Sequence, residues 1–247
     1  MNWFRRRSQT NPRGWKSPAA TTLLTLLLSA GCAGTDNSTE APSVEATPAE
    51  RSVRIETTGC GSASGRTGSG IVIEDDAVVT VAHLVVRADG VSANVGASGP
   101  IEAKVTAVDL ERDLALLRIE PTGFDRVPMA GISGETSGTG FVIGAAVSGT
   151  LPYTIERPAR ISIEEVLGET RHERLGYELD AITEMGDSGA GLYDDEERLI
   201  GMVFATSDEG TTTWATASSE IQAFFNGNRF LDTPLSCDQS SSRLSGV

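Results

Sequence analysis

The chain has 247 residues, and its 34 acidic against 20 basic residues give a formal net charge of −14 at pH 7. A protein this acidic is repelled by the phosphates of nucleic acids and by anionic lipid surfaces, so we expect no nucleic-acid partner and no docking through a basic patch. Its 27 glycines, few aromatic residues and short β-branched runs predict strands and turns rather than helices. The length suits one larger all-β domain or two small halves around a shared core.

Residues 1–31 are predicted to be an export signal rather than part of the fold. A basic front, which contains Arg5, Arg13 and Lys16, precedes an apolar run of about 12 residues that ends in small residues, as in a signal peptide. The segment carries five basic residues and no acidic one, so its removal takes the net charge from −14 to −19.

The end of this segment, LLSAGC, resembles the lipobox of bacterial lipoproteins. The resemblance implies that Cys32 is lipid-modified after cleavage and anchors the protein at the extracytoplasmic face of the cell membrane. Ser29 stands where a lipobox usually has a large aliphatic residue. The alternative is therefore an ordinary signal peptide cut nearby and a secreted protein.

Residues 32–50 are predicted to be a flexible tether. They show no hydrophobic period and are rich in Ala, Thr, Ser, Glu and Pro, a composition that cannot bury enough apolar surface to fold. About 18 residues of flexible chain span on the order of 25 Å. We therefore expect the folded domain to be held at roughly that distance from an anchored lipid.

Two sets of short β-rich runs follow, within a predicted domain of residues 51–231. They are bounded by Gly, Asp and Pro and do not alternate with helical segments, which favours antiparallel strands. We expect an all-β fold of two antiparallel six-stranded β-barrels packed together, with a short C-terminal helix. The first set comprises residues 52–57, 68–74, 77–85, 91–96, 101–109 and 114–120; the second comprises residues 138–147, 153–166, 176–182, 190–194, 198–206 and 211–217.

The C-terminal helix is predicted from a capping-box pattern of Ser219 and Gln222, the apolar face of EIQAFF, and Gly227 as its end. Residues 232–247 are predicted to be a polar tail. The acidic run DDEE, which starts at Asp194, is similar to a calcium-binding cluster in composition. Because it lies between two strands, we interpret it as a solvated hairpin turn.

Cys60 and Cys237 are the cysteines that remain once Cys32 is set aside. In an exported chain two cysteines are interpreted as a disulfide, which here would join the start of the domain to its end. The chain-entropy model gives roughly 4–5 kcal/mol for a loop of this length. Two free thiols are the alternative.

Three short motifs contain the candidate catalytic residues. His83 ends the apolar run VVTVAHLV, Asp113 directly precedes an apolar strand in RDLALL, and Ser188 lies in the glycine turn GDSGAG. Each alone has a structural explanation: a packed histidine, an aspartate bonded to its own backbone, and a serine in a polar turn. His172, the other histidine, lies in a charged stretch and is expected to be solvated. With two histidines we expect no metal site.

The three motifs occur in the order His, Asp, Ser, with the first two in one strand set and the serine in the other. With these motifs in this order, the chain resembles the trypsin/chymotrypsin-fold serine peptidases. Within them it is similar to the bacterial trypsin-like group that includes the HtrA type and the periplasmic acid-resistance protease of actinobacteria. The resemblance extends from Val53 to Phe225. It implies a serine endopeptidase that acts on protein or peptide substrates without a cofactor, in a cleft between the barrels.

Residue by residue, the resemblance implies that Ser188 is the nucleophile, His83 the general base, and Asp113 the group that orients the imidazole. The backbone N–H groups of Gly186 and Ser188 would form the oxyanion hole. The family usually has a further glycine where this chain has Ala190. This departure concerns the shape of the turn and not the two oxyanion donors.

Alignment with the family places Ile182, six residues before Ser188, at the base of the primary substrate pocket. Val203, Phe204 and Ala205 would form a wall of that pocket. An aliphatic floor implies that Arg or Lys at P1 is disfavoured and that a small or medium apolar side chain is preferred.

Two other functions compete with this one. A lipoprotein that keeps the fold but not turnover would act as a binding or scaffolding module, because site geometry rather than residue identity decides activity. A serine esterase of the α/β-hydrolase type needs Gly-x-Ser-x-Gly and the order Ser, Asp, His, which GDSGAG and its partners do not provide. The sequence predicts no oligomeric state.

Overall fold

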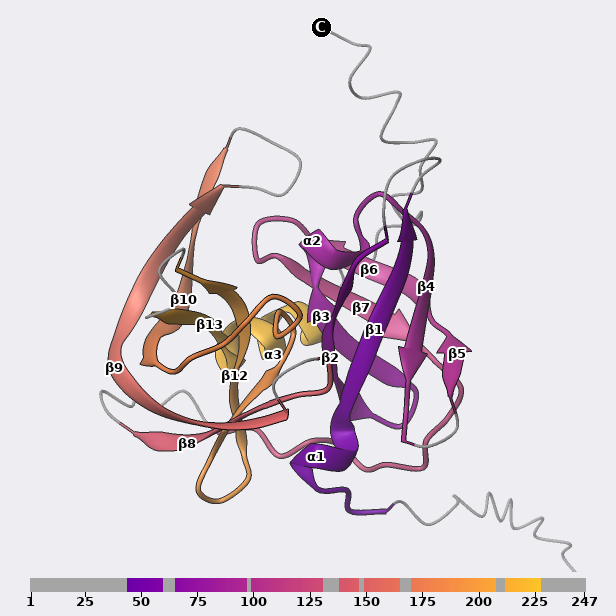
Figure 1. The fold of residues 1–247 in the computed structure, drawn as a ribbon, viewed down its shortest axis with the longest axis horizontal. Helices are drawn as coiled ribbons and strands as arrows, with labels where there is room; N and C mark the ends of the chain where they lie inside the picture. Colours follow the sequence, from indigo (N-terminus) through magenta and orange to yellow (C-terminus); the bar gives the residue numbers. More distant parts are fainter. Residues whose placement is uncertain are drawn as a thin grey trace, which may run out of the picture. The chain divides into compact units, whose positions relative to one another are not determined.

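A computed structural model describes residues 44–59, 65–96, 99–130, 138–146, 149–164, 170–207 and 212–227. All of them belong to one compact unit, residues 41–247. Two antiparallel β-structures make up this unit: a curled sheet from the N-terminal half and a closed ring of strands from the C-terminal half (Figure 1). The predicted all-β class, with two antiparallel halves and a short C-terminal helix, is confirmed.

The N-terminal half is a curled sheet with one strand more than predicted. Its strands are β1 (Ser52–Gly59), β2 (Thr67–Glu74), β3 (Ala77–Val81), β4 (Ala88–Asn94), β5 (Pro100–Glu102), β6 (Lys104–Asp109) and β7 (Leu114–Arg118). They lie in the order β5-β4-β1-β2-β3-β7-β6, and in the described residues β5 and β6 are not paired with each other. The strand predicted over residues 101–109 divides at Ala103, because the chain pairs with β4 before this residue and with β7 after it.

The C-terminal half is a closed barrel of six strands, as predicted. Its strands are β8 (Thr139–Gly144), β9 (Gly149–Glu164), β10 (Arg171–Asp180), β11 (Gly191–Asp194), β12 (Leu199–Thr206) and β13 (Thr213–Ala217). They close in the order β10-β13-β12-β11-β8-β9. The long hairpin of β9 and β10 curves around one side of this half (Figure 1).

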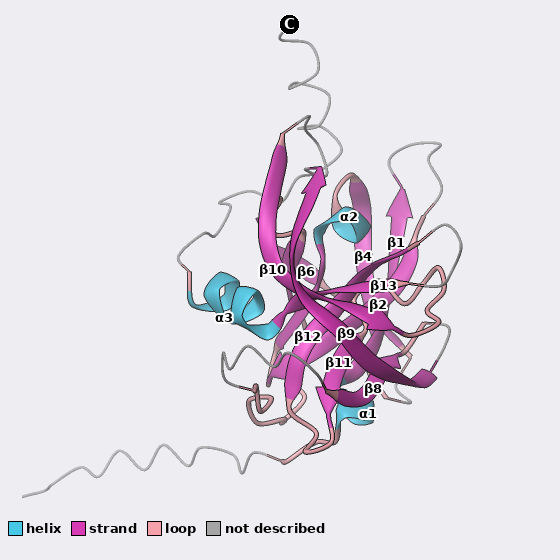
Figure 2. Cartoon of the chain, turned by 90° about the vertical axis from the view of Figure 1, so that its left-hand side faces the viewer, coloured by secondary structure: helices cyan, strands magenta, loops and turns pink. Residues whose placement is uncertain are grey.

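Three short helices accompany the strands in the described part of the chain (Figure 2): α1 (Pro48–Arg51), α2 (Ala82–Val85) and α3 (Ser218–Asn226). The prediction extended the strand of β3 through His83 to Val85, whereas the chain turns into α2 directly after Val81.

The predicted capping box of α3 is wrong. The helix begins directly after β13 with Ala217 as its N-cap and has no side-chain cap, so Ser219 and Gln222 already lie inside it. The helix is held by its apolar face instead: Ile221 is fully buried. Gly227 is the C-cap, as predicted, but with an extended backbone.

The main apolar core crosses from one half to the other. It contains most of the buried residues of the curled sheet together with residues of the ring and of α3, namely Tyr193, Leu199, Met202, Phe204, Ile221 and Phe224. A smaller cluster fills the inside of the ring. Six consecutive residues of β2 are buried, without the alternation of a strand that has one solvated face. This strand therefore lies between the halves.

The segment before β1 is folded, although the predicted flexible tether extended to Glu50. Val44 forms a parallel bridge with Phe124, and its N–H donates to the Gly123 carbonyl at 2.8 Å. Thr47 and Glu50 form a capping box at α1, in which the Glu50 carboxylate accepts the Thr47 N–H at 2.8 Å. These hydrogen bonds lower the pKa of Glu50.

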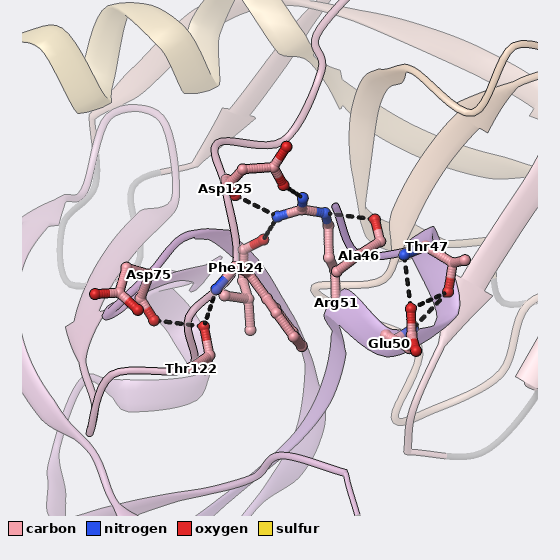
Figure 3. A network of polar contacts seen from close by, with 9 residues as sticks. Ala46, Thr47, Glu50, Arg51, Asp75, Thr122, Phe124 and Asp125 are labelled. Atoms are coloured by element: carbon pink, nitrogen blue, oxygen red, sulfur yellow. Dashed lines mark hydrogen bonds and ion pairs between the residues drawn. The ribbon is translucent and has the colours of Figure 1, made fainter. Parts of the chain in front are cut away.

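Arg51 at the end of α1 anchors this segment (Figure 3). Its side chain is 1% exposed and forms an ion pair with Asp125. The guanidinium also donates to the carbonyl oxygens of Asp125 at 2.7 Å and of Ala46 at 3.1 Å. A polar composition predicted a tether here, but a buried arginine satisfied by carbonyls and a carboxylate lets a polar segment pack.

The predicted signal segment, residues 1–31, and Cys32 lie outside the described residues, as do Cys60, Cys237 and the tail of residues 232–247. In the part of the chain that is described, none of the helices is long and apolar enough to cross a membrane.

Candidate active site

His83 and Asp113 meet at the end of two paired strands. β3 and β7 are antiparallel neighbours in which Val81 pairs with Leu114, so the residues just after β3 and just before β7 share one edge of the sheet. Asp113 accepts two hydrogen bonds from His83 there. The backbone N–H donates to Oδ1 at 2.8 Å, and Nδ1 donates to Oδ2 at 2.8 Å.

The two members of this pair differ in exposure. The side chain of Asp113 is 4% exposed, whereas that of His83 is 37% exposed. A buried carboxylate that accepts from Nδ1 fixes the tautomer and the plane of the ring. The pair thus leaves Nε2 as the ring nitrogen that can take a proton from another group.

Arg66 holds the turn of His83 from another direction. Its guanidinium donates to the carbonyl oxygen of His83 and, at 3.2 Å, to that of Val86. Both carbonyls are at the C-terminal end of α2, where a cation is favourable. No sequence motif singles out this arginine.

The serine turn, residues 183–190, connects β10 to β11 and contains the candidate nucleophile. Gly186 and Gly189 have left-handed φ angles of 108° and 92°. The carboxylate of Asp187 is buried and accepts the N–H of Glu184 at 2.9 Å, while the Asp187 N–H donates to the Glu184 carbonyl at 3.0 Å. These two glycines therefore allow the closed turn to form, since it requires backbone conformations that other residues avoid.

Ser69 of β2 joins the serine turn to the curled sheet. Its N–H donates to the Ser188 carbonyl at 2.8 Å, and its hydroxyl donates to the Gly186 carbonyl at 3.2 Å. The same hydroxyl accepts the backbone N–H groups of Ala145 at 3.2 Å and Ala146 at 3.3 Å. One buried side chain thus fixes two segments of the ring against the sheet.

Gly68 lies where the serine turn approaches the turn of His83. A Cβ atom at this glycine would lie 2.7 Å from the Leu84 side chain and 3.0 Å from the Ser188 carbonyl oxygen. Leu84 directly follows His83, so the backbone of Ser188 and the histidine turn are separated by little more than this glycine. The predicted meeting of residues from both halves is therefore observed at the level of the backbone.

The hydroxyl of Ser188 bonds to a group other than the histidine pair. It donates to the carbonyl oxygen of Phe204 at 3.5 Å, and the described hydrogen bonds include none between this hydroxyl and His83. The structure thus brings His83 and Asp113 together and holds the backbone of Ser188 beside them, without the final hydrogen bond of a triad.

The proposed oxyanion donors are Gly186 and Ser188. Among the hydrogen bonds of the described residues, none uses the backbone N–H of either residue. Their neighbours Asp187, Gly189 and Ala190 all donate to backbone carbonyls. The two N–H groups expected from the resemblance are therefore among those of the described turn that no hydrogen bond within the protein uses.

The residues predicted to form the substrate pocket differ widely in exposure. Val203 and Phe204 are 1% and 8% exposed and belong to the apolar cores, whereas Ile182 is 71% exposed. Ala205 is half-buried beside the main core. Ile182 instead borders a surface pocket of about 360 Å³, lined also by Leu151, Pro152, Tyr153, Thr154, Asp180 and Ala181.

Three threonine hydroxyls meet next to Ile182, a feature that the sequence did not indicate. Thr183 bonds to Thr206 and, at 2.8 Å, to Thr213, whose hydroxyl donates to the Ala181 carbonyl at 2.8 Å. They tie the start of the serine turn to β12 and β13. In the described part of the chain, no three His, Cys, Asp or Glu side chains gather in a way that could hold a metal ion.

A family model described as the trypsin-like peptidase domain matches residues 68–202, from β2, the strand of Ser69, to β12. The chain belongs to this family. It is a homologue of serine proteases, and its two β-halves are those of the trypsin-like fold.

Two protein relatives show the same relationship in sequence. The chain is 30% identical over 159 residues to the serine protease Rv3671c of Mycobacterium tuberculosis, an alignment that covers 62% of this chain and 40% of the relative. It is 28% identical over 162 residues to the serine protease HTRA1A of Danio rerio, covering 64% of this chain and 33% of the relative. The chain thus spans well under half the length of either relative.

Solved structures show the same fold. The active form of the Rv3671c protease from M. tuberculosis superposes with a TM-score of 0.70 at 24% identity, covering 77% of this chain and 86% of that chain. A variant of the HtrA-type protease AlgW with a tripeptide superposes with a TM-score of 0.62 at 19% identity, covering 73% of this chain and 62% of that chain.

Proposed function

We propose that the protein is a serine endopeptidase that cleaves peptide bonds through His83, Asp113 and Ser188. The observation that carries the proposal is the double hydrogen bond from His83 to the buried carboxylate of Asp113, at 2.8 Å for both contacts. A carboxylate in this position orients the imidazole and stabilises the imidazolium that forms when the ring takes a proton.

In the proposed reaction, Ser188 Oγ attacks the carbonyl carbon of the peptide bond while Nε2 of His83 takes the hydroxyl proton. The imidazolium then gives this proton to the leaving amine, and the acyl group stays on Ser188. A water molecule, deprotonated by the same ring, attacks the acyl-enzyme and releases the acid. The hydroxyl must first leave the Phe204 carbonyl, and because this contact is long at 3.5 Å, the rotation costs little.

The backbone N–H groups of Gly186 and Ser188 would stabilise the negative oxygen of the tetrahedral intermediates. Donors that are already in place need no reorganisation when charge develops, and the loss of one typically costs about 2.7–4 kcal/mol of the activation free energy. The hydrogen bonds between Glu184 and Asp187, and from Ser69 to Gly186, hold the turn that presents them.

We further propose that the enzyme acts outside the cytoplasm, anchored by a lipid on Cys32. The support is the signal-like pattern of residues 1–31 and its LLSAGC ending. Secretion after cleavage by an ordinary signal peptidase is the alternative. Protein or peptide substrates follow from the family.

A second candidate function is a binding or scaffolding protein with this fold and no turnover. The observation that favours it is the hydroxyl of Ser188, which bonds to the Phe204 carbonyl rather than to His83. This candidate requires that the serine stay in its present rotamer when a peptide occupies the cleft.

A fluorophosphonate probe tests the first function against the second. The protein should be labelled on one serine, and the label should disappear in Ser188→Ala but persist in Ser162→Ala, which removes an exposed serine of β9. A folded wild-type protein that takes up no label, or a label that survives Ser188→Ala, would contradict the proposed chemistry.

A further inference from the structure

Arg174 is a buried cation next to the residues proposed for catalysis. It lies on β10 of the ring, and the whole residue is 2% exposed. Its guanidinium stacks on the ring of Phe204, with 3.9 Å between Cζ and the ring centroid, and Nη1 donates to the carbonyl oxygen of Arg112. No sequence motif or spacing distinguishes this residue.

This placement is unfavourable for stability. Nε and Nη2 of Arg174 are buried and have no hydrogen-bond partner among the described residues. Burial lowers the pKa of Arg174 to about 10, against the opposing effect of Asp113, Glu220 and Asp109. The side chain remains cationic at neutral pH, and each unsatisfied buried donor destabilises the folded protein. An apolar side chain would cover Phe204 without this cost, so packing alone does not account for an arginine.

Arg112, whose carbonyl accepts from Arg174, is held by its side chain as well. The Arg112 guanidinium donates to Asp109 at 2.7 Å and to Glu220 of α3 at 2.8 Å. Glu220 also accepts the backbone N–H of Leu175, the residue after Arg174, at 3.0 Å. The turn before β7 is thus clamped between α3 and β10, with Arg174 bound to its backbone.

The Arg112 carbonyl belongs to the peptide bond that leads into Asp113. Asp113 has a left-handed φ of 52°, a conformation that is unfavourable for residues other than glycine. Rotation of this peptide towards an ordinary conformation would swing the Asp113 carboxylate away from His83. A donor fixed on the preceding carbonyl opposes that rotation.

We propose that Arg174 is a positioning residue of the active site: from the ring, it holds the peptide bond before Asp113 and thereby keeps the carboxylate on His83. The same side chain packs on Phe204, whose carbonyl accepts the hydroxyl of Ser188. One residue of the ring therefore contacts the supports of both the acid and the nucleophile. The proposal deepens the proposed function, since it concerns the pair on which that function rests.

The test compares Arg174→Met, which removes charge and donors, with Arg174→Lys, which keeps the charge and one flexible donor. Arg171→Met is the matched control, because Arg171 is an exposed arginine on the same strand. Three quantities are measured on the whole protein: the rate of fluorophosphonate labelling, the melting temperature, and the downfield NMR signal of the His83 Nδ1 proton. His172→Gln assigns that signal, since the chain has two histidines.

We expect Arg174→Met to slow labelling on the order of 10-fold to 100-fold, as small misplacements in active sites do. Its melting temperature should stay at or above that of the wild type, and the Nδ1 signal should broaden or disappear. Arg174→Lys should recover part of both the rate and the signal, and Arg171→Met should change neither. A structural role alone would lower the melting temperature and leave the signal of the folded protein intact.

An unchanged Nδ1 signal and an unchanged labelling rate in folded Arg174→Met would overturn the proposal. If that variant does not fold, Arg174→Lys decides: a weakened signal with slower labelling supports the proposal, and wild-type values for both overturn it. A wild-type protein that is never labelled would end the proposed function. The Nδ1 signal requires no turnover, however, and would still decide whether Arg174 positions Asp113.

Discussion

Asp113 is one of three described residues other than glycine with a left-handed backbone, together with Arg87 and Glu197. The other two are exposed, whereas Asp113 is buried with its carboxylate on His83. An aspartate tolerates this conformation better than most residues, but the conformation still has to be held by its surroundings. The carbonyl of Asp113 accepts the Ala82 N–H at 3.0 Å, and the peptide before it accepts from Arg174.

The substitution Asp113→Asn tests the role of the carboxylate. An amide at this position can donate to Nδ1 and would then favour the wrong tautomer of His83, so we expect labelling of Ser188 to slow by about 10⁴-fold. The fold should persist, because an asparagine also tolerates the left-handed backbone. Labelling rates at several pH values, with circular dichroism as the control for folding, check this. A loss of less than about tenfold would argue against the charge of Asp113 in the mechanism.

At this scale the sequence predicted residues with recognisable motifs and missed residues whose role depends on long-range contacts. His83, Asp113 and the glycines of the serine turn were predicted from short motifs in a fixed order. Arg174 and Ser69 were not, because each acts on residues more than 60 positions away in the chain. The hydroxyl of Ser188 likewise bonds to a carbonyl on another strand, a contact that no local motif indicates.

At the scale of elements, β2 is the joint between the two halves. Its residue Ser69 binds the serine turn through backbone and side chain, and its hydroxyl accepts two N–H groups of the segment after β8. A Cβ at Gly189 would lie 1.8 Å from the Ser69 carbonyl oxygen, so the serine turn rests directly on the strand. The position of the oxyanion donors thus depends on an element of the other half.

Removal of the Ser69 hydroxyl should therefore impair catalysis more than binding. In Ser69→Ala the Gly186 carbonyl loses a donor, and two backbone N–H groups lose their acceptor. We expect kcat for a peptide substrate to fall roughly tenfold with KM nearly unchanged, because the oxyanion donors act mainly in the transition state. Steady-state kinetics check this, with Ser92→Ala of β4 as control. An equal loss in that control, or a rise in KM alone, would contradict the role of Ser69.

The boundaries of helices and strands could be predicted where the hydrophobic periodicity was clear. The predictions were wrong at helix ends, where the capping interactions determine the boundary. The sequence contains a capping box of Thr47 and Glu50 with Pro48 at the first helical position. α1 was nevertheless missed, because the surrounding residues have the composition of a tether. At α3 a capping-box pattern was present in the sequence but not used, since β13 leads straight into the helix. A capping motif stabilises a helix end only where the chain direction leaves that end open.

At the scale of the whole molecule, two buried tyrosines make the folding stability of the protein depend on pH in the alkaline range. The Tyr153 hydroxyl donates to the Tyr193 carbonyl at 3.1 Å, whereas the buried Tyr193 hydroxyl has no partner among the described residues. Burial raises the pKa of both phenols above the ordinary value of 10.0. The two phenols therefore contribute their full stabilisation of the folded state below pH 10.0. This stabilisation is lost as the pH rises above that value, because the phenols ionise first in the unfolded chain.

The variants Tyr193→Phe and Tyr153→Phe should change stability in opposite directions. At neutral pH the first removes an unsatisfied buried hydroxyl and should raise the free energy of unfolding by about 1 kcal/mol; the second removes a hydrogen bond and should lower it by about 1 kcal/mol. At about pH 10.5 the free energy of unfolding of the wild type should be lower by about 0.8 kcal/mol for each of the two tyrosines. Each variant keeps only one of them, so its free energy of unfolding should fall by about 0.8 kcal/mol in all. Urea unfolding at both pH values measures this. A destabilised Tyr193→Phe would show that its hydroxyl has a partner.

The arrangement of the two halves could be predicted only in outline. Two sets of strands without βαβ alternation predicted two antiparallel halves, and the ring has the six strands expected. The curled sheet differs, since the run from Ile101 to Asp109 changes its pairing partner at Ala103. Hydrophobic pattern predicts that a residue is in a strand, but not which neighbour the strand pairs with.

The entry of the chain into the domain has a mechanical consequence. Val44 lies parallel to Phe124 in the linker between the halves, the segment that joins β7 to β8. The Val44 N–H donates to the Gly123 carbonyl at 2.8 Å, and the Val44 carbonyl accepts the Asp125 N–H at 3.1 Å. A force that pulls on the chain before Val44 acts on both of these hydrogen bonds at once, in shear. Once they break, the force acts on Arg51 and its ion pair with Asp125. Tension thus enters at the linker and Arg51, neither of which is among the residues proposed for catalysis. We therefore expect that the domain can be held at its N-terminal end under load while the histidine pair and the serine turn keep their geometry.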